Sequence, residues 1–102
     1  MGKNIDYMME LVNEYLSDKT PRYIFELDFQ TEILARYKKM VREDRDYAEY
    51  FYDLLSEDGV DTGDGLSDTE FKQLIRRQYN KVKSVADDSL LFSGCILSTI
   101  AG

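Results

Sequence analysis

The acidic, glycine-rich stretch Asp58–Phe71 most strongly constrains the fold, because one helical pattern ends there and another begins. It contains half of the six glycines of the chain, which are Gly59, Gly63 and Gly65. Glycine adopts positive φ at no steric cost, so the chain can turn sharply at each of them. Gly59 also stands where a glycine ends a helix, directly after the helical run that ends with Leu54-Leu55-Ser56-Glu57-Asp58. The stretch therefore predicts a turn between two helices.

The end of this stretch has the spacing of a capping box, Ser67-Asp68-Thr69-Glu70. In that motif the serine oxygen accepts from the backbone N–H three residues later, and the glutamate accepts from the serine N–H. The motif predicts that a helix begins directly after Ser67.

The same stretch resembles the calcium loop of the EF-hand family over about a dozen residues. Asp64-Gly65 resembles the ligand and turn glycine, and Glu70-Phe71 resembles the bidentate glutamate and the core residue that follows it. No gap-free register places ligands at loop positions 1, 3, 5 and 12 around a glycine at position 6. The resemblance implies a calcium-binding helix-loop-helix module as the alternative function. Its carboxylate ligands would be Asp58, Asp61, Asp64 and Glu70.

Composition excludes several chemistries. The chain has 102 residues and a net charge of −7, so we expect one domain that does not bind nucleic acid. It has no histidine, which removes Ser-His-Asp and Cys-His catalysis and histidine-ligated zinc. No cofactor motif is present. A single cysteine and no apolar stretch after Met1 favour a cytoplasmic protein without a membrane segment.

The first amphipathic segment follows Asn4, which we expect to cap a helix. Its apolar residues recur at steps of three and four: Ile5, Met8, Met9, Val12, Tyr15 and Leu16. Its opposite face is acidic, with Asp6, Glu10 and Glu14 spaced four residues apart. This face is either a solvated surface or a strip that meets a basic partner.

The second segment has two interpretations. Thr20-Pro21 has the pattern of a helix start, with threonine as N-cap and proline in the first turn. The alternation over Tyr23–Phe29 is typical of a strand, whereas the apolar spacing continues as a helical stripe. That stripe comprises Phe25, Phe29, Ile33, Tyr37, Met40 and Val41. No second strand is available for pairing, so we expect a helix from about Pro21 to Arg42, with an extended Tyr23–Phe29 as the fallback.

Two more helices are expected. Asp44 is the predicted cap of the third, whose apolar stripe is Tyr47, Tyr50, Phe51, Leu54 and Leu55. The fourth is expected from about Asp68 to Val82, with an inner stripe of Phe71, Leu74, Ile75, Tyr79 (or Gln78) and Val82. Basic residues gather in the C-terminal halves of the second and fourth helices, as the helix dipole favours.

The C-terminal segment Ser89–Gly102 contains no charged residue. It is too short to span a bilayer, which needs about 20 apolar residues. It could dock on the helices, pair with another copy to form a homo-oligomer, or be a non-native extension. Cys95 has no histidine to activate it, so we expect an inert thiol.

These patterns predict an all-α protein, a small four-helix bundle with short connections. The domain would span residues 1–88, followed by the apolar tail 89–102. Tyrosine-rich helices and an acidic surface favour a non-catalytic protein-interaction module that binds a basic or mixed protein surface. Inhibitors, immunity-type proteins and accessory subunits are examples. The expected partner-binding residues are Asp6, Glu10, Glu14, Tyr47, Tyr50 and Tyr52.

Overall fold

The computed structural model describes the backbone of residues 2–101 and the side chains of residues 2–85. It contains four α-helices: α1 (Lys3–Leu16), α2 (Arg22–Glu43), α3 (Arg45–Phe51) and α4 (Asp68–Ala101). A π-helix (Tyr52–Glu57) and a 3-10 turn (Val60–Thr62) lie between α3 and α4. No strand occurs within residues 2–101, so the all-α prediction is confirmed.

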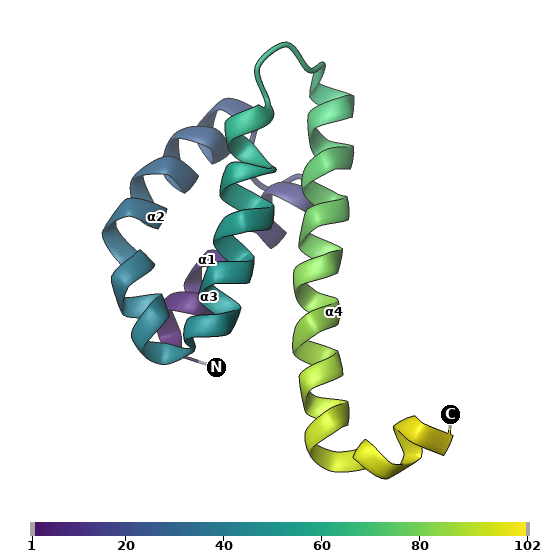
Figure 1. Cartoon of the computed structure of the whole chain (residues 1–102). Coiled ribbons are helices and arrows are strands. Elements are labelled where there is room, and N and C mark those ends of the chain that lie inside the picture. The colour runs from purple at the N-terminus through teal and green to yellow at the C-terminus, as the bar shows by residue number, and fades with distance from the viewer. Residues whose placement is uncertain (1, 102) are drawn as a thin grey trace.

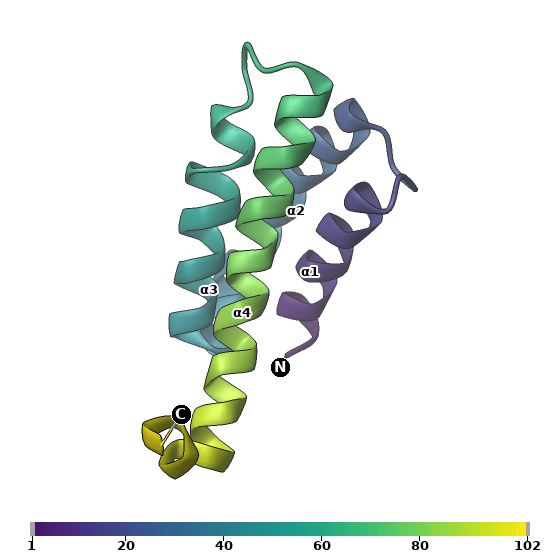
Figure 2. The same cartoon turned by 90° about the vertical axis from the view of Figure 1, so that its right-hand side faces the viewer.

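The four helices pack side by side around one hydrophobic core (Figures 1 and 2). The two views show α2 and α4 on opposite sides of the molecule, with α1 and α3 each lying between them. One side of α2 therefore faces away from the other helices. α4 extends past the ends of its neighbours. The predicted apolar tail 89–102 lies outside the residues whose side chains are described.

The start of α1 differs from the prediction. Gly2, rather than Asn4, is the N-cap, and Asn4 lies buried in the first turn. The backbone N–H groups of that turn have no partner within the helix and are satisfied by a distant side chain: the Glu43 carboxylate accepts from Asn4 N and Ile5 N, each at 2.9 Å. The cap therefore comes from the end of α2 rather than from the local sequence, and Asn4 was assigned the wrong role.

The segment Tyr23–Phe29 is helical, so the strand fallback is wrong. In a strand Tyr23, Phe25, Leu27 and Phe29 would share one face. In α2 the two phenylalanines are fully buried, whereas Tyr23 is 72% exposed and Leu27 is 64% exposed. The predicted bounds are confirmed within one residue at each end, although Pro21 is the N-cap rather than the first helical residue.

A cluster of aromatic side chains forms one part of the core. Phe25 stacks on Tyr15 of α1 with ring centroids 4.4 Å apart, and it also contacts Phe29 and Phe71 at 5.7 and 6.4 Å. Phe29 in turn stacks on Phe51 at 6.0 Å. The cluster thus joins all four helices, and offset or tilted aromatic pairs add to the stability gained from burial.

The third helix begins as predicted, with the Asp44 carboxylate accepting from Tyr47 N at 3.1 Å. It then widens into the π-helix Tyr52–Glu57, which the periodicity did not indicate. Gly59 follows this segment with a φ of −125°, so the chain does not use positive φ at this glycine. A side chain at Gly59 would place Cβ 2.5 Å from the Leu55 carbonyl oxygen, so close backbone approach requires the glycine.

The capping box before α4 is confirmed in both directions. Glu70 N donates to Ser67 Oγ at 3.1 Å, and Ser67 N donates to a Glu70 carboxylate oxygen at 2.9 Å. α4 begins at Asp68 as predicted but continues beyond Val82 to Ala101. Its inner stripe is confirmed at Phe71, Ile75 and Val82, which are fully buried, whereas Leu74 and Tyr79 are partly buried.

Candidate functional site

The predicted acidic strip lies on the surface of α1. Asp6 and Glu10 are exposed, and Glu14 is partly buried. Burial raises the pKa of Tyr79 on α4, and the negative charge of Glu10 raises it further. The strip is therefore accessible to a partner along its first two turns.

The three predicted partner-binding tyrosines lie mostly at the edge of the core. Tyr47 is only 6% exposed, and its hydroxyl lies 3.7 Å from the Met9 sulfur. Tyr50 and Tyr52 are partly buried against the core. The Tyr52 ring packs on Tyr37 with centroids 4.9 Å apart, joining the π-helix to α2. These side chains contribute more to packing than to an accessible surface.

The carboxylates of the predicted calcium loop are not gathered into one shell. Glu70 is engaged with Ser67, and this hydrogen bonding to the backbone and side chain of Ser67 lowers the pKa of Glu70. Among the side chains described, no three acidic or cysteine residues lie close enough together to hold a metal ion. Asp58 instead contributes its backbone carbonyl, which accepts from Gln78 Nε2 at 3.2 Å. Gly65 has the positive φ, 86°, that the turn requires.

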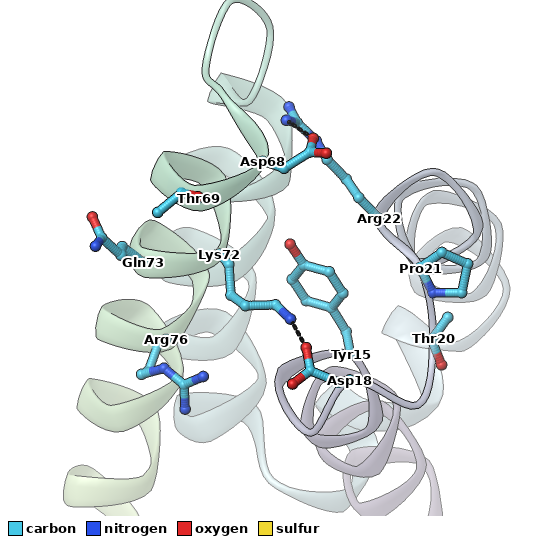
Figure 3. Close-up of a pocket in the computed structure, with 10 residues that line it drawn as sticks. All are labelled: Tyr15, Asp18, Thr20, Pro21, Arg22, Asp68, Thr69, Lys72, Gln73 and Arg76. Carbon is cyan, nitrogen blue, oxygen red and sulfur yellow. Dashed lines mark hydrogen bonds and ion pairs between the residues drawn. The ribbon is translucent and has the colours of Figure 1, made fainter.

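A cavity of about 590 Å³ lies between the end of α1 and the beginnings of α2 and α4 (Figure 3). Arg22 joins its walls: the guanidinium donates to the Leu66 and Gly63 carbonyls at 2.8 and 3.0 Å and lies 4.3 Å from the centroid of the Phe71 ring. It also pairs with Asp68 at 2.9 Å. Sequence reasoning missed this role, because the carbonyl partners of Arg22 lie more than forty positions away.

Opposite charges are paired across this cavity. Lys72 binds Asp18, and this hydrogen bond, followed by the charge of Lys72, lowers the pKa of Asp18. Arg76 donates to the Leu16 carbonyl at 3.3 Å. Burial raises the pKa of Tyr15, whose ring forms part of the cavity wall. Because Arg22, Lys72 and Arg76 already have partners within the chain, the cavity explains how α1, α2 and α4 are joined better than it explains ligand binding.

The outward face of α2 is the most exposed apolar surface among the described side chains. Leu34 is 82% exposed, and together with Tyr23 and Leu27 it supplies three of the four large hydrophobic residues that are exposed. The fourth, Tyr7, is covered on one side by Arg36, which stacks 3.6 Å from its ring centroid. Single exposed hydrophobic residues are common on protein surfaces, but these three lie together on one helix face.

This apolar face continues along the whole of α2 at alternating steps of four and three residues. We call it the α2 seam, which comprises Tyr23, Leu27, Gln30, Leu34, Tyr37 and Val41. Its last two members are partly buried and line a groove of about 440 Å³ between α2 and α3. The spacing is visible in the sequence, but the predicted apolar stripe of this helix is the one that contains Phe25 and Phe29. The seam is the candidate functional site.

No protein-family model matches the chain, and the comparisons with curated proteins and with solved structures likewise find no match. Within the part of the chain that the structure describes, no helix combines the length and the hydropathy needed to span a bilayer.

Proposed function

We propose that the protein is a non-catalytic protein-interaction module that binds its partner through the α2 seam. The observation that carries this proposal is the exposure of Tyr23, Leu27 and Leu34 on one face of one helix. Burying such side chains in an interface releases about 25 cal/mol for each Å² of apolar surface removed from water. A helix with an exposed apolar face can pack against a second helix or lie in a groove of a partner protein.

The charges of α2 suit a partner of mixed charge. The first half of α2 carries Glu26, Asp28 and Glu32, and the second half carries Arg36, Lys38, Lys39 and Arg42. Complementary charges of this kind select partners and their orientation more than they add affinity. The exposed Asp6 and Glu10 of α1 supply a second, acidic area that suits a basic surface.

The test compares two variants that each add one negative charge to α2. Leu34→Asp changes the seam, whereas Ala35→Asp changes the next residue, which is also exposed but points about 100° away around the helix. Because both positions are exposed, we expect both variants to keep the helical content of the original chain. Immobilised original protein and Ala35→Asp should retain the same partner from lysate of the native host, and Leu34→Asp should lose it. Equal capture by both variants would contradict the proposal.

A further inference from the structure

We propose that the α2 seam binds a second copy of the chain, with the two α2 helices antiparallel about a twofold axis. This inference rests on the proposed function, because it names the occupant of the same surface. Three independent properties of α2 support it: the spacing of the seam, the groove at one end of it, and the order of its charges.

The spacing is that of a helix seam that packs against another helix. Steps of four and three residues place all six seam residues within a narrow stripe, as in coiled coils. From Tyr23 to Val41 the stripe is about 27 Å long at the usual rise of a helix. The buried face of α2, with Phe25, Phe29 and Met40, is separate from it and already packed. α2 therefore has a second apolar stripe, and its first four positions, Tyr23 to Leu34, are exposed among the described side chains.

An antiparallel arrangement gives every seam residue a partner. When the two seams are aligned about their common centre, Tyr23 lies opposite Val41 of the second copy, and Leu27 lies opposite Tyr37 of the second copy. Gln30 then faces Leu34. Twofold symmetry makes each of these pairings twice, which is the property of an isologous interface.

The two ends of the seam are complementary in shape. At the beginning Tyr23 projects from α2 and is 72% exposed. At the end Val41 lies in the groove between α2 and α3, whose rim carries Lys38, Arg42 and Arg45. In the antiparallel register Tyr23 of each copy enters the groove of the other. Guanidinium groups stack favourably on aromatic rings, so the basic rim suits a tyrosine.

The charges of α2 favour the antiparallel over the parallel arrangement. In this register Glu26 and Asp28 of one copy lie level with Lys38 and Arg36 of the other, whereas parallel helices would place like charges side by side. Glu32 lies level with Glu32 of the second copy, and each is paired with Arg36 of its own chain. α2 has five basic and four acidic residues, so it is nearly neutral although the chain has a charge of −7. Pairing through α2 therefore brings together a helix that is nearly neutral in each copy.

Sedimentation equilibrium of the full chain tests the inference at micromolar to submillimolar concentrations. We expect the mass of two chains for the original protein and for Ala35→Asp. Leu34→Asp should raise the dissociation constant at least about tenfold, as expected for a central interface residue. A monomeric original protein, or a Leu34→Asp dimer as tight as the original, would overturn the inference.

Disulfide trapping tests the orientation in a Cys95→Ser background. Leu27→Cys mixed with Tyr37→Cys should give a cross-linked heterodimer, because the antiparallel register places these positions opposite each other. Leu27→Cys alone should not cross-link, since its two copies would lie about 15 Å apart along the helix axis. Cross-linking of Leu27→Cys with itself would instead indicate parallel helices and overturn the antiparallel arrangement. Circular dichroism of each variant verifies that α-helical content is retained.

The outcomes separate this inference from the proposed function. If the original chain is monomeric but retains a different protein through Leu34, the second-copy inference fails and the interaction module stands. If the chain is monomeric and Leu34→Asp captures the same proteins as the original chain, both the second-copy inference and the proposed function fail.

Discussion

Glu43 caps the helix that contains Asn4, although the two residues are 39 positions apart. One carboxylate oxygen of Glu43 accepts from Asn4 N at 2.9 Å and from Asn4 Nδ2 at 2.7 Å, and the other accepts from Ile5 N at 2.9 Å. The side-chain carbonyl of Asn4 in turn accepts from Arg36 at 2.9 Å. A negative charge also suits the positive end of the α1 dipole. This network fixes α1 to both the middle and the end of α2.

Glu43→Gln should lower the thermal midpoint of unfolding. Glutamine keeps the size of the side chain but replaces one acceptor oxygen by an amide that faces N–H donors. Glu49→Gln is the matched control, because Glu49 is an exposed acid on α3. Differential scanning calorimetry of both variants at neutral pH measures the difference. An equal midpoint for the two variants would mean that the Glu43 cap does not stabilise α1.

Stability should fall at both ends of the pH range. Partial desolvation raises the pKa of Glu43, but hydrogen bonds from Ile5 and Asn4 outweigh it and hold that pKa below its ordinary 4.5. The pKa values of Asp18 and Glu70 are lowered as well. Groups with lowered pKa stabilise the folded state above their unfolded pKa and lose this contribution as pH falls through the folded value. The loss of stability on acidification should therefore begin below about pH 4.5.

At alkaline pH the free energy of unfolding should fall as the pH rises. Burial raises the pKa of Tyr15 and Tyr79 above the ordinary 10.0, so their contribution is present below pH 10.0 and is lost above the folded value. Urea titrations across the pH range measure how the free energy of unfolding falls at acid and at alkaline pH. Glu43→Gln should make the fall at acid pH less steep. Stability that rises on acidification from pH 5 to pH 3 would be inconsistent with this account.

Phe25 and Tyr23 should differ sharply, although both are aromatic residues in the first turn of α2. Phe25→Ala should cost about 3–5 kcal/mol, because it empties a fully buried site in contact with three other rings. Tyr23→Ala should change the free energy of unfolding by no more than about 0.5 kcal/mol. Urea unfolding of dilute protein avoids any contribution from self-association. Comparable losses at the two positions would contradict the helical assignment of this segment.

Calcium should leave the thermal midpoint unchanged. The acidic stretch before α4 is a turn whose key glutamate is engaged in the capping box, and its carboxylates are not assembled around one point. A ligand of the folded state would raise the midpoint by mass action, by about 2.7 kcal/mol of stability at a hundred times its Kd. Melts in EDTA and in millimolar calcium compare the two states. A rise that Asp64→Ala abolishes would restore the calcium-binding alternative.

The helical core was predictable because its signals are local. The stripes of α1 and α4 follow helical spacing, and the capping box of Ser67 and Glu70 needs only four consecutive residues. The Glu43 cap was not predictable, because it joins residues that only the packing of α1 on α2 brings together. The same holds for Arg22, whose carbonyl partners lie in the turn before α4.

The candidate site is an intermediate case. The spacing of the α2 seam is present in the sequence, yet spacing alone does not say which of two apolar stripes on one helix faces the core. Phe25 and Phe29 occupy the inner face, and this leaves Leu27 and Leu34 in contact with solvent. Tyr47 of α3 shows the opposite case. Its residue type favours an interface, but its side chain is buried.

The most direct test of the central claim is photo-cross-linking from Leu34 in living cells of the native host. A benzophenone amino acid replaces Leu34 in one strain and Ala35 in another, and adducts are identified by mass spectrometry. The account predicts a single abundant adduct from position 34, to a second copy of the chain or to another protein, and little from position 35. Equal yields from the two positions, or no adduct from position 34, would contradict the claim that the α2 seam is a docking surface.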